Sequence, residues 1–210
     1  MSFNKEQPYN DLPLLLPDNN IWETMAIYKK LAEARAALAE LKGRLPVIPN
    51  PLMLINTLVL QEAKDSSTIE NIFTTNDELY KAFSSSSPNV NPSTKEVLRY
   101  REALWSAFAK LKSPTSYSVG LAVEIFKTIT GKDEGIRTVQ VYIGSSNSVV
   151  YTPPEHGNIL MDKLNNWFDT ALNNNSIDPL IKMAMLHYQF EAIHPFTDGN
   201  GRTGRILNVL

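Results

Sequence analysis

The sequence of 210 residues contains no cysteine, which excludes disulfide bonds and thiolate metal sites. No apolar run approaches the roughly 18 residues that a membrane-spanning helix requires, and Met1–Pro8 lacks the apolar core of a secretory signal peptide. The formal net charge is only −2, so overall electrostatics do not favour nucleic-acid binding. We therefore expect a soluble, cytoplasmic protein with no membrane partner.

The chain also lacks the common glycine-rich phosphate loop. No Gly-x-x-x-x-Gly-Lys-Ser/Thr segment occurs anywhere in it. A phosphate-binding site in this protein must therefore be built from a different pattern.

Helical patterns cover most of the chain, and hydrophobic residues make up 43% of it, enough for a buried core. Residues 1–20 form a proline-rich arm whose leucines predict docking on the body. Gly43 and Gly131 are expected to stop helices, and Ser93-x-x-Glu96 to form a capping box. We expect helices at about 21–42, 51–64, 67–73, 76–83, 93–112, 118–130, 155–173 and 179–193, and a last one from about 202. The predicted fold class is mainly α.

The pattern changes to alternation near residue 138. Thr138–Ile143 and Ser148–Thr152 alternate as strands do, residues 144–147 supply a turn, and Pro153 and Pro154 end the second strand. Two short strands cannot build a core of their own, but a free strand edge can pair with an extended peptide. We expect one small β-hairpin in an otherwise helical protein.

The most informative segment is His-Pro-Phe-Thr-Asp-Gly-Asn-Gly-Arg-Thr-Gly-Arg, which begins at His194. Its glycines lead into a helix, and the unpaired amides of Gly199–Gly201 at the start of that helix favour anions. Arg202 and Arg205 lie three residues apart, so they share a helix face and can hold one polyanion. His194 can transfer a proton near neutral pH, and the Asp198 carboxylate suits Mg²⁺ that is held jointly with phosphates. Each feature alone is common in ordinary loops and helices, but the combination predicts phosphoryl or nucleotidyl transfer.

This segment resembles the signature of the Fic family, His-Pro-Phe-x-(Asp/Glu)-Gly-Asn-Gly-Arg-x-x-Arg, at every defined position. The resemblance implies a Fic-type helical bundle with a hairpin flap. Residues 93–210 are then the catalytic core, and residues 1–92 an N-terminal region of arm and helices. It also implies a nucleotidyltransferase, a protein adenylyltransferase that moves AMP from ATP to a hydroxyl side chain of a target protein. ATP is the implied substrate and Mg²⁺ the implied metal ion.

The same resemblance implies roles for individual residues. His194 is the implied catalytic base and Asp198 the implied metal ligand. The implied nucleotide-binding residues are Gly199, Asn200, Gly201, Arg202, Thr203, Gly204 and Arg205. The segment that resembles the target-docking flap consists of Val141, Tyr142, Ile143 and Gly144. The alternative for the flap is a structural hairpin that only covers the core.

A second segment of interest lies at residues 64–73. Ser66, Glu70 and Asn71 resemble the Fic inhibitory motif, Ser/Thr-x-x-x-Glu-Gly/Asn, at its defined positions. This resemblance implies an inhibitory helix N-terminal to the catalytic motif, in which Glu70 pairs with Arg205 and blocks the γ-phosphate. The alternative is structural, because Ser67-x-x-Glu70 also has the spacing of a capping box.

Two other functions remain compatible with the sequence. In the same fold, the main activity can be removal of AMP from a modified protein, with Glu70 orienting a water. The protein can also be a regulatory nucleotide-binding module with little turnover, which leaves His194 without a purpose. The sequence does not identify the target protein, which can be this protein itself, and leaves a homodimer open. Leu210 lies about two turns into a helix, which predicts a fragment, and a nucleic-acid partner is expected only if a following domain supplies it.

Overall fold

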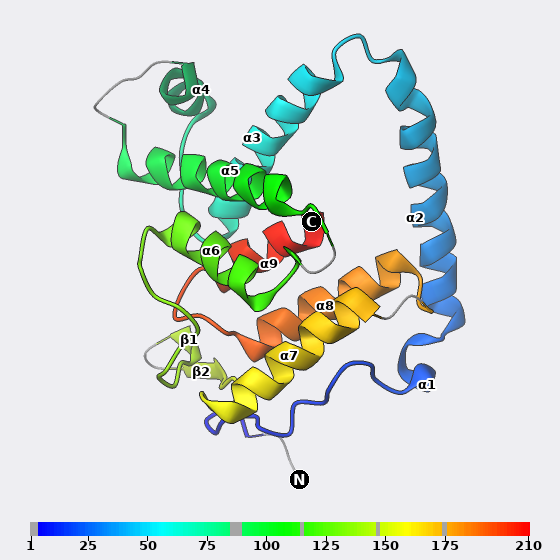
Figure 1. The fold of residues 1–210 in the computed structure, drawn as a ribbon, viewed down its shortest axis with the longest axis vertical. Coiled ribbons are helices and arrows are strands. Elements are labelled where there is room, and N and C mark those ends of the chain that lie inside the picture. Colours follow the sequence, from blue (N-terminus) through cyan, green and yellow to red (C-terminus); the bar gives the residue numbers. More distant parts are fainter. Residues whose placement is uncertain (1–3, 85–89, 114–115, 146–147, 174–175) are drawn as a thin grey trace.

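The computed structural model describes residues 4–84, 90–113, 116–145, 148–173 and 176–210, and these residues are mostly helical. Figure 1 shows the elements in chain order: α1 (Asn19–Trp22), α2 (Met25–Arg44), a 3₁₀ turn (Leu45–Val47), α3 (Pro51–Ile69), α4 (Asn76–Ser84), α5 (Pro92–Lys110), α6 (Val119–Thr130), β1 (Ile143–Ser145), β2 (Ser148–Tyr151), α7 (Asn158–Asn173), α8 (Pro179–Ile193) and α9 (Asn200–Val209). The predicted class, mainly α with one small hairpin, is confirmed.

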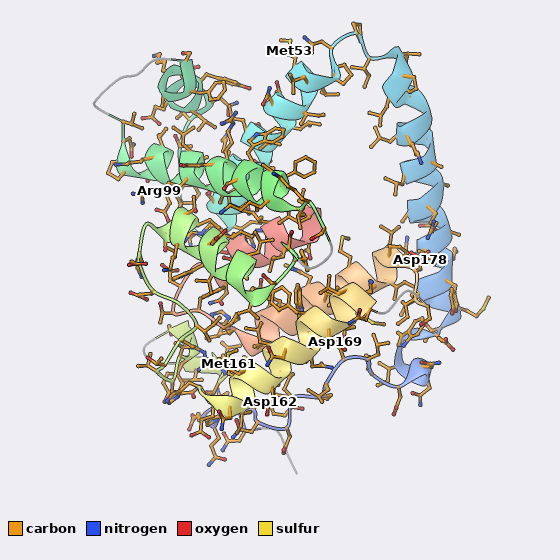
Figure 2. All side chains as sticks on the ribbon, viewed as in Figure 1. Met53, Arg99, Met161, Asp162, Asp169 and Asp178 are labelled. Carbon is orange, nitrogen blue, oxygen red and sulfur yellow. The ribbon has the colours of Figure 1, made fainter. Side chains whose placement is uncertain are left out.

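Helix α9 lies at the centre of the bundle. It contacts α3, α5, α6 and α8, while α5 packs on α6 and α7 packs along α8 (Figure 1). Helix α2 runs along the edge and buries none of its residues. Asp178, labelled in Figure 2, lies at the start of α8. Its ion pair with Arg35 links α2 to the body. None of the helices in the described parts of the chain is both long and apolar enough to cross a bilayer.

One hydrophobic core joins the two predicted regions. Leu60 and Leu79 come from before residue 93, and they share this core with Tyr100 and Trp167 from after it. Trp167 also donates its indole N–H to the carbonyl of Leu186, 2.7 Å away, so its polar atom is satisfied inside the core. The N-terminal helices and the proposed catalytic core therefore pack as one body.

Phe196 anchors the loop between α8 and α9 in this core. Its side chain is fully buried, and its ring stacks on Phe126 with centroids 4.4 Å apart and planes 2° from parallel. Phe190 from the last turn of α8 packs beside it, with ring centroids 6.4 Å apart. The buried ring fixes the loop that carries the histidine and the aspartate of the motif.

The proline-rich arm docks on the body, as expected. Leu12 is buried in the main core. The carbonyl of Leu12 accepts a hydrogen bond from Lys163 at 2.6 Å, and the carbonyl of Pro13 accepts one from Gln189 at 2.6 Å. Because these donors lie on α7 and α8, the arm covers the outer side of that helix pair.

Three expected helix boundaries are wrong. The first long helix is divided into α1 and α2, since the Thr24 hydroxyl caps a new helix by accepting from the amide of Ile27, and α2 continues through Gly43 to Arg44. The helices expected at 51–64 and 67–73 are a single helix, α3. Helix α5 begins with Asn91 as its cap, so Ser93 and Glu96 form no capping box.

The hairpin is shorter than predicted on its first strand. Strand β1 begins at Ile143, not Thr138, and pairs antiparallel with β2 across an irregularity between Ile143 and Gly144. The partner segment beyond Tyr151 contains Pro153 and Pro154, which have no amide hydrogen to extend the ladder. The predicted 144–147 turn is wrong for Gly144 and Ser145, which belong to β1, and residues 146–147 lie outside the described residues.

The packing of Phe196 generates a stability prediction. We expect Phe196→Ala to lower the free energy of unfolding by about 3–5 kcal/mol, because it removes a fully buried ring and leaves a cavity. Urea denaturation monitored by circular dichroism measures the loss. Tyr188→Ala is the control, since that ring is 73% exposed and its removal should cost little. Equal losses in the two variants would contradict the anchoring role.

Candidate functional site

His194 lies at the point where α8 ends. Its backbone is left-handed, with φ 51° and ψ 62°, and its amide closes the last turn on the carbonyl of Phe190 at 2.9 Å. The following residue, Pro195, cannot continue a helix. The ring Nδ1 lies 3.3 Å from the carbonyl of Glu191. In the tautomer in which Nδ1 donates to that carbonyl, Nε2 is the free base.

The pKa of His194 lies below its usual value. The first cause is burial, which disfavours the charged imidazolium, and the positive charge of Arg137 acts in the same direction. The Glu191 carbonyl and the carboxylates of Glu70 and Asp198 act in the opposite direction. The imidazole is therefore largely neutral at neutral pH, which is the state that can accept a proton.

Asn200 closes the loop that follows His194. Its side-chain oxygen accepts from the amide of Phe196 at 2.9 Å, and its side-chain nitrogen donates to the carbonyl of the same residue at 2.9 Å. The Asn200 side chain is buried, so both bonds are shielded from water. This pair of bonds makes the loop a rigid bridge between α8 and the first turn of α9.

The N-terminal end of α9 is open to an anion. The cap residue is Gly199, with φ 64°, and no side chain caps this helix end in the described structure. The amide of Gly199 donates to the Asp198 carboxylate at 2.6 Å, which leaves the amides of Asn200 and Gly201 at the helix start. The predicted phosphate cradle therefore has the backbone geometry that an anion needs.

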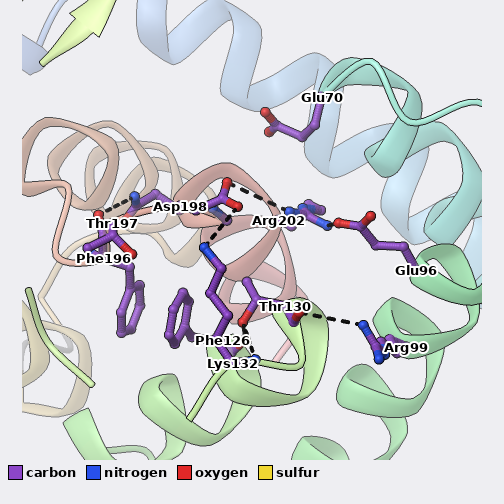
Figure 3. A network of polar contacts seen from close by, with 12 residues as sticks. Glu70, Glu96, Arg99, Phe126, Thr130, Lys132, Phe196, Thr197, Asp198 and Arg202 are labelled. Carbon is purple, nitrogen blue, oxygen red and sulfur yellow. Dashed lines mark hydrogen bonds and ion pairs between the residues drawn. The ribbon is translucent and has the colours of Figure 1, made fainter. Parts of the chain in front are cut away.

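Asp198 projects from the loop beside this helix end, and its side chain is 57% exposed. One carboxylate oxygen lies 3.8 Å from the ammonium of Lys132 and the other 3.9 Å from the guanidinium of Arg202 (Figure 3). No group of three or more potential metal ligands occurs in the described parts of the chain. A single accessible carboxylate fits Mg²⁺ only where phosphates supply the remaining ligands, which is a common Mg²⁺ arrangement.

Arg202 is held rigidly inside the bundle. Its side chain is 3% exposed and forms an ion pair with Glu96 of α5 (Figure 3). Sequence reasoning missed Glu96 as a site residue because it interpreted that position as part of a helix cap. A pairing across 106 positions leaves no local signal in the sequence.

Arg205 meets the segment that resembles an inhibitory motif. Its Nε donates to the Ser66 hydroxyl at 2.5 Å, and one terminal nitrogen donates to the Ser66 carbonyl at 2.9 Å and to the Glu70 carboxylate at 2.8 Å. Asn71 follows in a left-handed conformation, φ 62°, which asparagine tolerates better than most residues. The expected contact between Glu70 and Arg205 is present.

The capping-box interpretation of this segment is wrong. Ser67 lies inside the last turn of α3, and its carbonyl accepts from the amides of Glu70 and Ile72 at 3.0 Å each. Glu70 stands at the C-terminal cap position of α3. Because a carboxylate is unfavourable at a helix C-terminus, the helix alone does not account for an acidic residue here.

Glycine at position 201 lets the Glu70 carboxylate approach the backbone of α9. A Cβ atom at Gly201 would lie 2.3 Å from a carboxylate oxygen of Glu70 and 3.0 Å from the Arg205 guanidinium. Glu70 thus occupies the anion-favouring side of the first turn of α9. Thr203 and Gly204, also predicted to bind nucleotide, are buried, and a Cβ at Gly204 would lie 2.7 Å from the carboxylate of Glu191.

Glu191 is a second residue that sequence reasoning missed. Burial raises the pKa of its carboxyl to about 7, Arg205 lowers it and Glu70 raises it. Its position three residues before His194 was the available signal. A carboxyl this close to the motif makes the local charge sensitive to pH near neutrality.

The hairpin lies beside the last turn of α8 and the loop that follows it, residues 194–199, which is named the catalytic loop after its predicted role. Tyr151 at the end of β2 donates its hydroxyl to the carbonyl of Ala192 in α8 at 2.9 Å. Of the four residues predicted to form the flap, Tyr142 and Gly144 are exposed, and Val141 and Ile143 are partly buried. The accessible residues leave the edge of β1 open along part of its length.

Two family models match the sequence. The model described as Fic/DOC family N-terminal matches residues 28–109, and the model described as Fic/DOC family matches residues 116–210. Among curated relatives, Protein adenylyltransferase fic-1 of Caenorhabditis elegans is 46% identical over 77 residues, which cover 34% of this chain and 13% of the relative. Protein adenylyltransferase Fic of Drosophila willistoni is 30% identical over 119 residues, which cover 53% of this chain and 23% of the relative. The chain thus matches only a small part of the length of these relatives.

Solved structures show the same fold. A Fic family protein from Desulfovibrio desulfuricans superposes with a TM-score of 0.73 at 24% identity, over 89% of this chain and 57% of that one. Fic-1 from C. elegans superposes with a TM-score of 0.67 at 22% identity, over 87% of this chain and 56% of that one. The two family models, which together cover most of the sequence, and this shared fold lead to one conclusion: the chain belongs to the Fic/DOC family.

Proposed function

We propose that this protein transfers AMP from ATP to a hydroxyl side chain of a target protein, and that Glu70 inhibits the transfer. One observation carries the proposal: the Glu70 carboxylate binds Arg205 at 2.8 Å and lies against Gly201, at the open end of α9. A carboxylate in that place is a substitute for a phosphate. The relatives named protein adenylyltransferases support the reaction class.

The chemistry begins with a proton transfer at His194. Nε2 takes the proton of the target hydroxyl while the oxygen of that hydroxyl attacks the α-phosphorus of ATP. The bond from the α-phosphorus to the bridging oxygen breaks, and pyrophosphate leaves with that oxygen. AMP remains bound to the target through a phosphodiester. Neutral imidazole is required for this step, and burial favours that form at neutral pH.

The phosphates are held by backbone amides and by two unlike arginines. The amides of Asn200 and Gly201 face the phosphate oxygens and stabilise the charge that develops there. Arg202 acts from a fixed position because Glu96 holds it. Arg205 is partly exposed and pairs with the γ-phosphate only after it releases Glu70. Thr203 and Gly204, the remaining predicted nucleotide-binding residues, are buried and pack α9 against the neighbouring helices.

Asp198 would hold the Mg²⁺ that accompanies ATP. Its exposed carboxylate lies within reach of the space in front of α9, and Lys132 and Arg202 flank it. When bound, the ion screens the phosphate charge and orients the α- and β-phosphates. Lys132 is the group that must move aside, since its ammonium is near the same carboxylate.

The target segment docks along the flap, Val141–Gly144. Backbone pairing with a strand edge binds an extended peptide without reading its side chains. Tyr151 ties the hairpin to the last turn of α8, so a docked hydroxyl is carried close to His194. The target protein is unidentified, and the protein itself is one candidate.

Substitution of the base gives the first test. We expect His194→Ala to lower AMP transfer by roughly 10²–10⁴-fold, the usual contribution of a general base, while ATP affinity stays near that of the wild type. Labelled-ATP transfer and calorimetric binding measure the two quantities. In the wild type, transfer should rise with pH through a midpoint below 6.5, because the histidine must lose its proton. Near wild-type transfer in the variant would contradict the assignment.

The metal assignment has a separate test. We expect Asp198→Ala to abolish both transfer and its dependence on Mg²⁺, because the phosphate charge then lacks its protein-anchored ion. Transfer is measured over a Mg²⁺ titration with EDTA as the zero point. Lys132→Ala is the matched control, since it removes the neighbouring charge and leaves the carboxylate. Equal wild-type transfer with and without Mg²⁺ would show that Asp198 has another role.

The inhibitory assignment is tested by removing the carboxylate. We expect Glu70→Gly and Glu70→Gln to raise transfer, self-modification included, by at least about tenfold, since a charge-assisted hydrogen bond is worth roughly 1.5–3 kcal/mol. Asp65→Gly on the same helix is the control for helix destabilisation. Transfer, AMP removal and melting temperature are measured on each variant.

The three measurements separate the alternatives. Raised transfer in both Glu70 variants, and not in Asp65→Gly, supports inhibition. Loss of AMP removal without a gain in transfer would make Glu70 a catalytic residue for the removal of AMP from a modified protein. A lower melting temperature with unchanged transfer would leave Glu70 a structural residue and defeat the inhibitory proposal.

A further inference from the structure

Arg137 is a buried cation that holds three backbone carbonyls. It lies between α6 and β1, is 3% exposed, and donates from Nε to the carbonyl of His194 at 2.9 Å and from one terminal nitrogen to that of Val139 at 3.1 Å. The other terminal nitrogen donates to the carbonyl of Pro154. Its own amide donates to the carbonyl of Pro195 at 2.9 Å. All of these groups lie at the catalytic loop or at the base of the hairpin.

These bonds join two parts of the site that are distant in sequence. Val139 precedes β1 and Pro154 follows β2, so Arg137 holds both ends of the hairpin. The same guanidinium holds the backbone of His194. Gln140 adds a further hydrogen bond at the base of the hairpin, because its side-chain amide donates to the carbonyl of Pro153 at 3.0 Å. The planar fork of arginine is suited to such a three-way contact, and no other side chain presents donors in that arrangement.

The charge of Arg137 has no carboxylate counter-ion within 4.0 Å of its guanidinium in the described parts of the chain. Burial lowers the pKa of Arg137 to about 10, which still leaves it charged at neutral pH. A buried charge without a carboxylate partner is costly, so the three-carbonyl contact is made at a cost in stability.

We propose that Arg137 is a positioning residue that fixes the flap relative to His194 and so keeps the imidazole aimed at the docked hydroxyl. Its positive charge is a secondary influence, after burial, that also favours the neutral imidazole. The role in transfer rests on the proposed function, while the effect on the imidazole does not. Among the other charged groups around the ring, Glu70 from the end of α3 and Asp198 from the loop before α9 favour the imidazolium. Arg137 opposes these two carboxylates.

Two substitutions separate the contribution of the charge from that of the fork. Arg137→Met removes both, and Arg137→Lys keeps the charge but cannot hold three carbonyls in one plane. Lys163→Met is the matched control, because Lys163 is also a buried cation and donates to a carbonyl, that of Leu12, away from the catalytic loop. It reports what the loss of a buried cation does to the fold in general.

The first measurement is the pKa of His194 by proton NMR. The chain has only three histidines, and His194→Ala identifies the signal. We expect Arg137→Met to raise this pKa above that of the wild type, although burial still holds it down, and Arg137→Lys and Lys163→Met to leave it unchanged. An unchanged value in Arg137→Met would overturn the electrostatic part. If Arg137→Met does not fold, Arg137→Gln, which removes the charge and keeps hydrogen-bond donors, replaces it: a raised pKa there supports the charge effect, and an unchanged one overturns it.

The second measurement is self-modification with labelled ATP, carried out in the Glu70→Gly background. We expect kcat to fall by about 100-fold in Arg137→Met, since small misplacements of reacting groups cost this much, and by less in Arg137→Lys. KM for ATP should change little, because the phosphates are held by α9. Full kcat in Arg137→Lys would overturn the positioning part. No transfer in any background, together with the expected NMR shift, would defeat the proposed function and leave the role of the charge intact.

Discussion

The rest of the site depends on the two hydrogen bonds between the Asn200 side chain and the backbone of Phe196. They close a short loop whose other anchor is the stack of Phe196 on Phe126. Because both anchors are buried, the loop cannot relax independently of the core. His194 at one end of the loop and the amides of α9 at the other therefore keep a constant separation. This rigidity is the preorganisation that electrostatic catalysis requires.

The arginines of α9 are balanced by protein carboxylates in different ways. Arg202 pairs with Glu96 inside the bundle and is 3% exposed, whereas Arg205 pairs with Glu70 at the end of α3 and is 20% exposed. The proposed function requires only the Arg205 pair to open. Glu191 interacts electrostatically with Arg205, and the pKa of its carboxyl is about 7. The charge beside Arg205 therefore changes with pH near neutrality.

Local sequence patterns predicted correctly those features that depend on interactions between residues near one another in the chain. The motif at residues 194–205, the α8 boundaries, the stop of α6 at Gly131 and the docked arm follow from propensity, capping and composition. The contacts of Glu96 and Arg137 could not be predicted, because each joins segments that only the folded chain brings together. The false capping box at Ser67 has the same cause: burial of Ser66 and Ser67 against the body keeps α3 helical beyond the position where the local pattern suggested a new start.

Gly201 has a consequence for how inhibition can be changed by mutation. The Glu70 carboxylate approaches the bare backbone at Gly201 and leaves no room for a Cβ atom there, and the proposed phosphate site uses the amide of the same residue. Under the proposed function, a side chain at this position would disrupt both the inhibitory contact with Glu70 and the phosphate-binding site. If Glu70 inhibits as proposed, the strength of inhibition can be changed from the α3 side of the contact, at Glu70, without a change in α9. Inhibition and chemistry would then be separable by mutation although they share one surface.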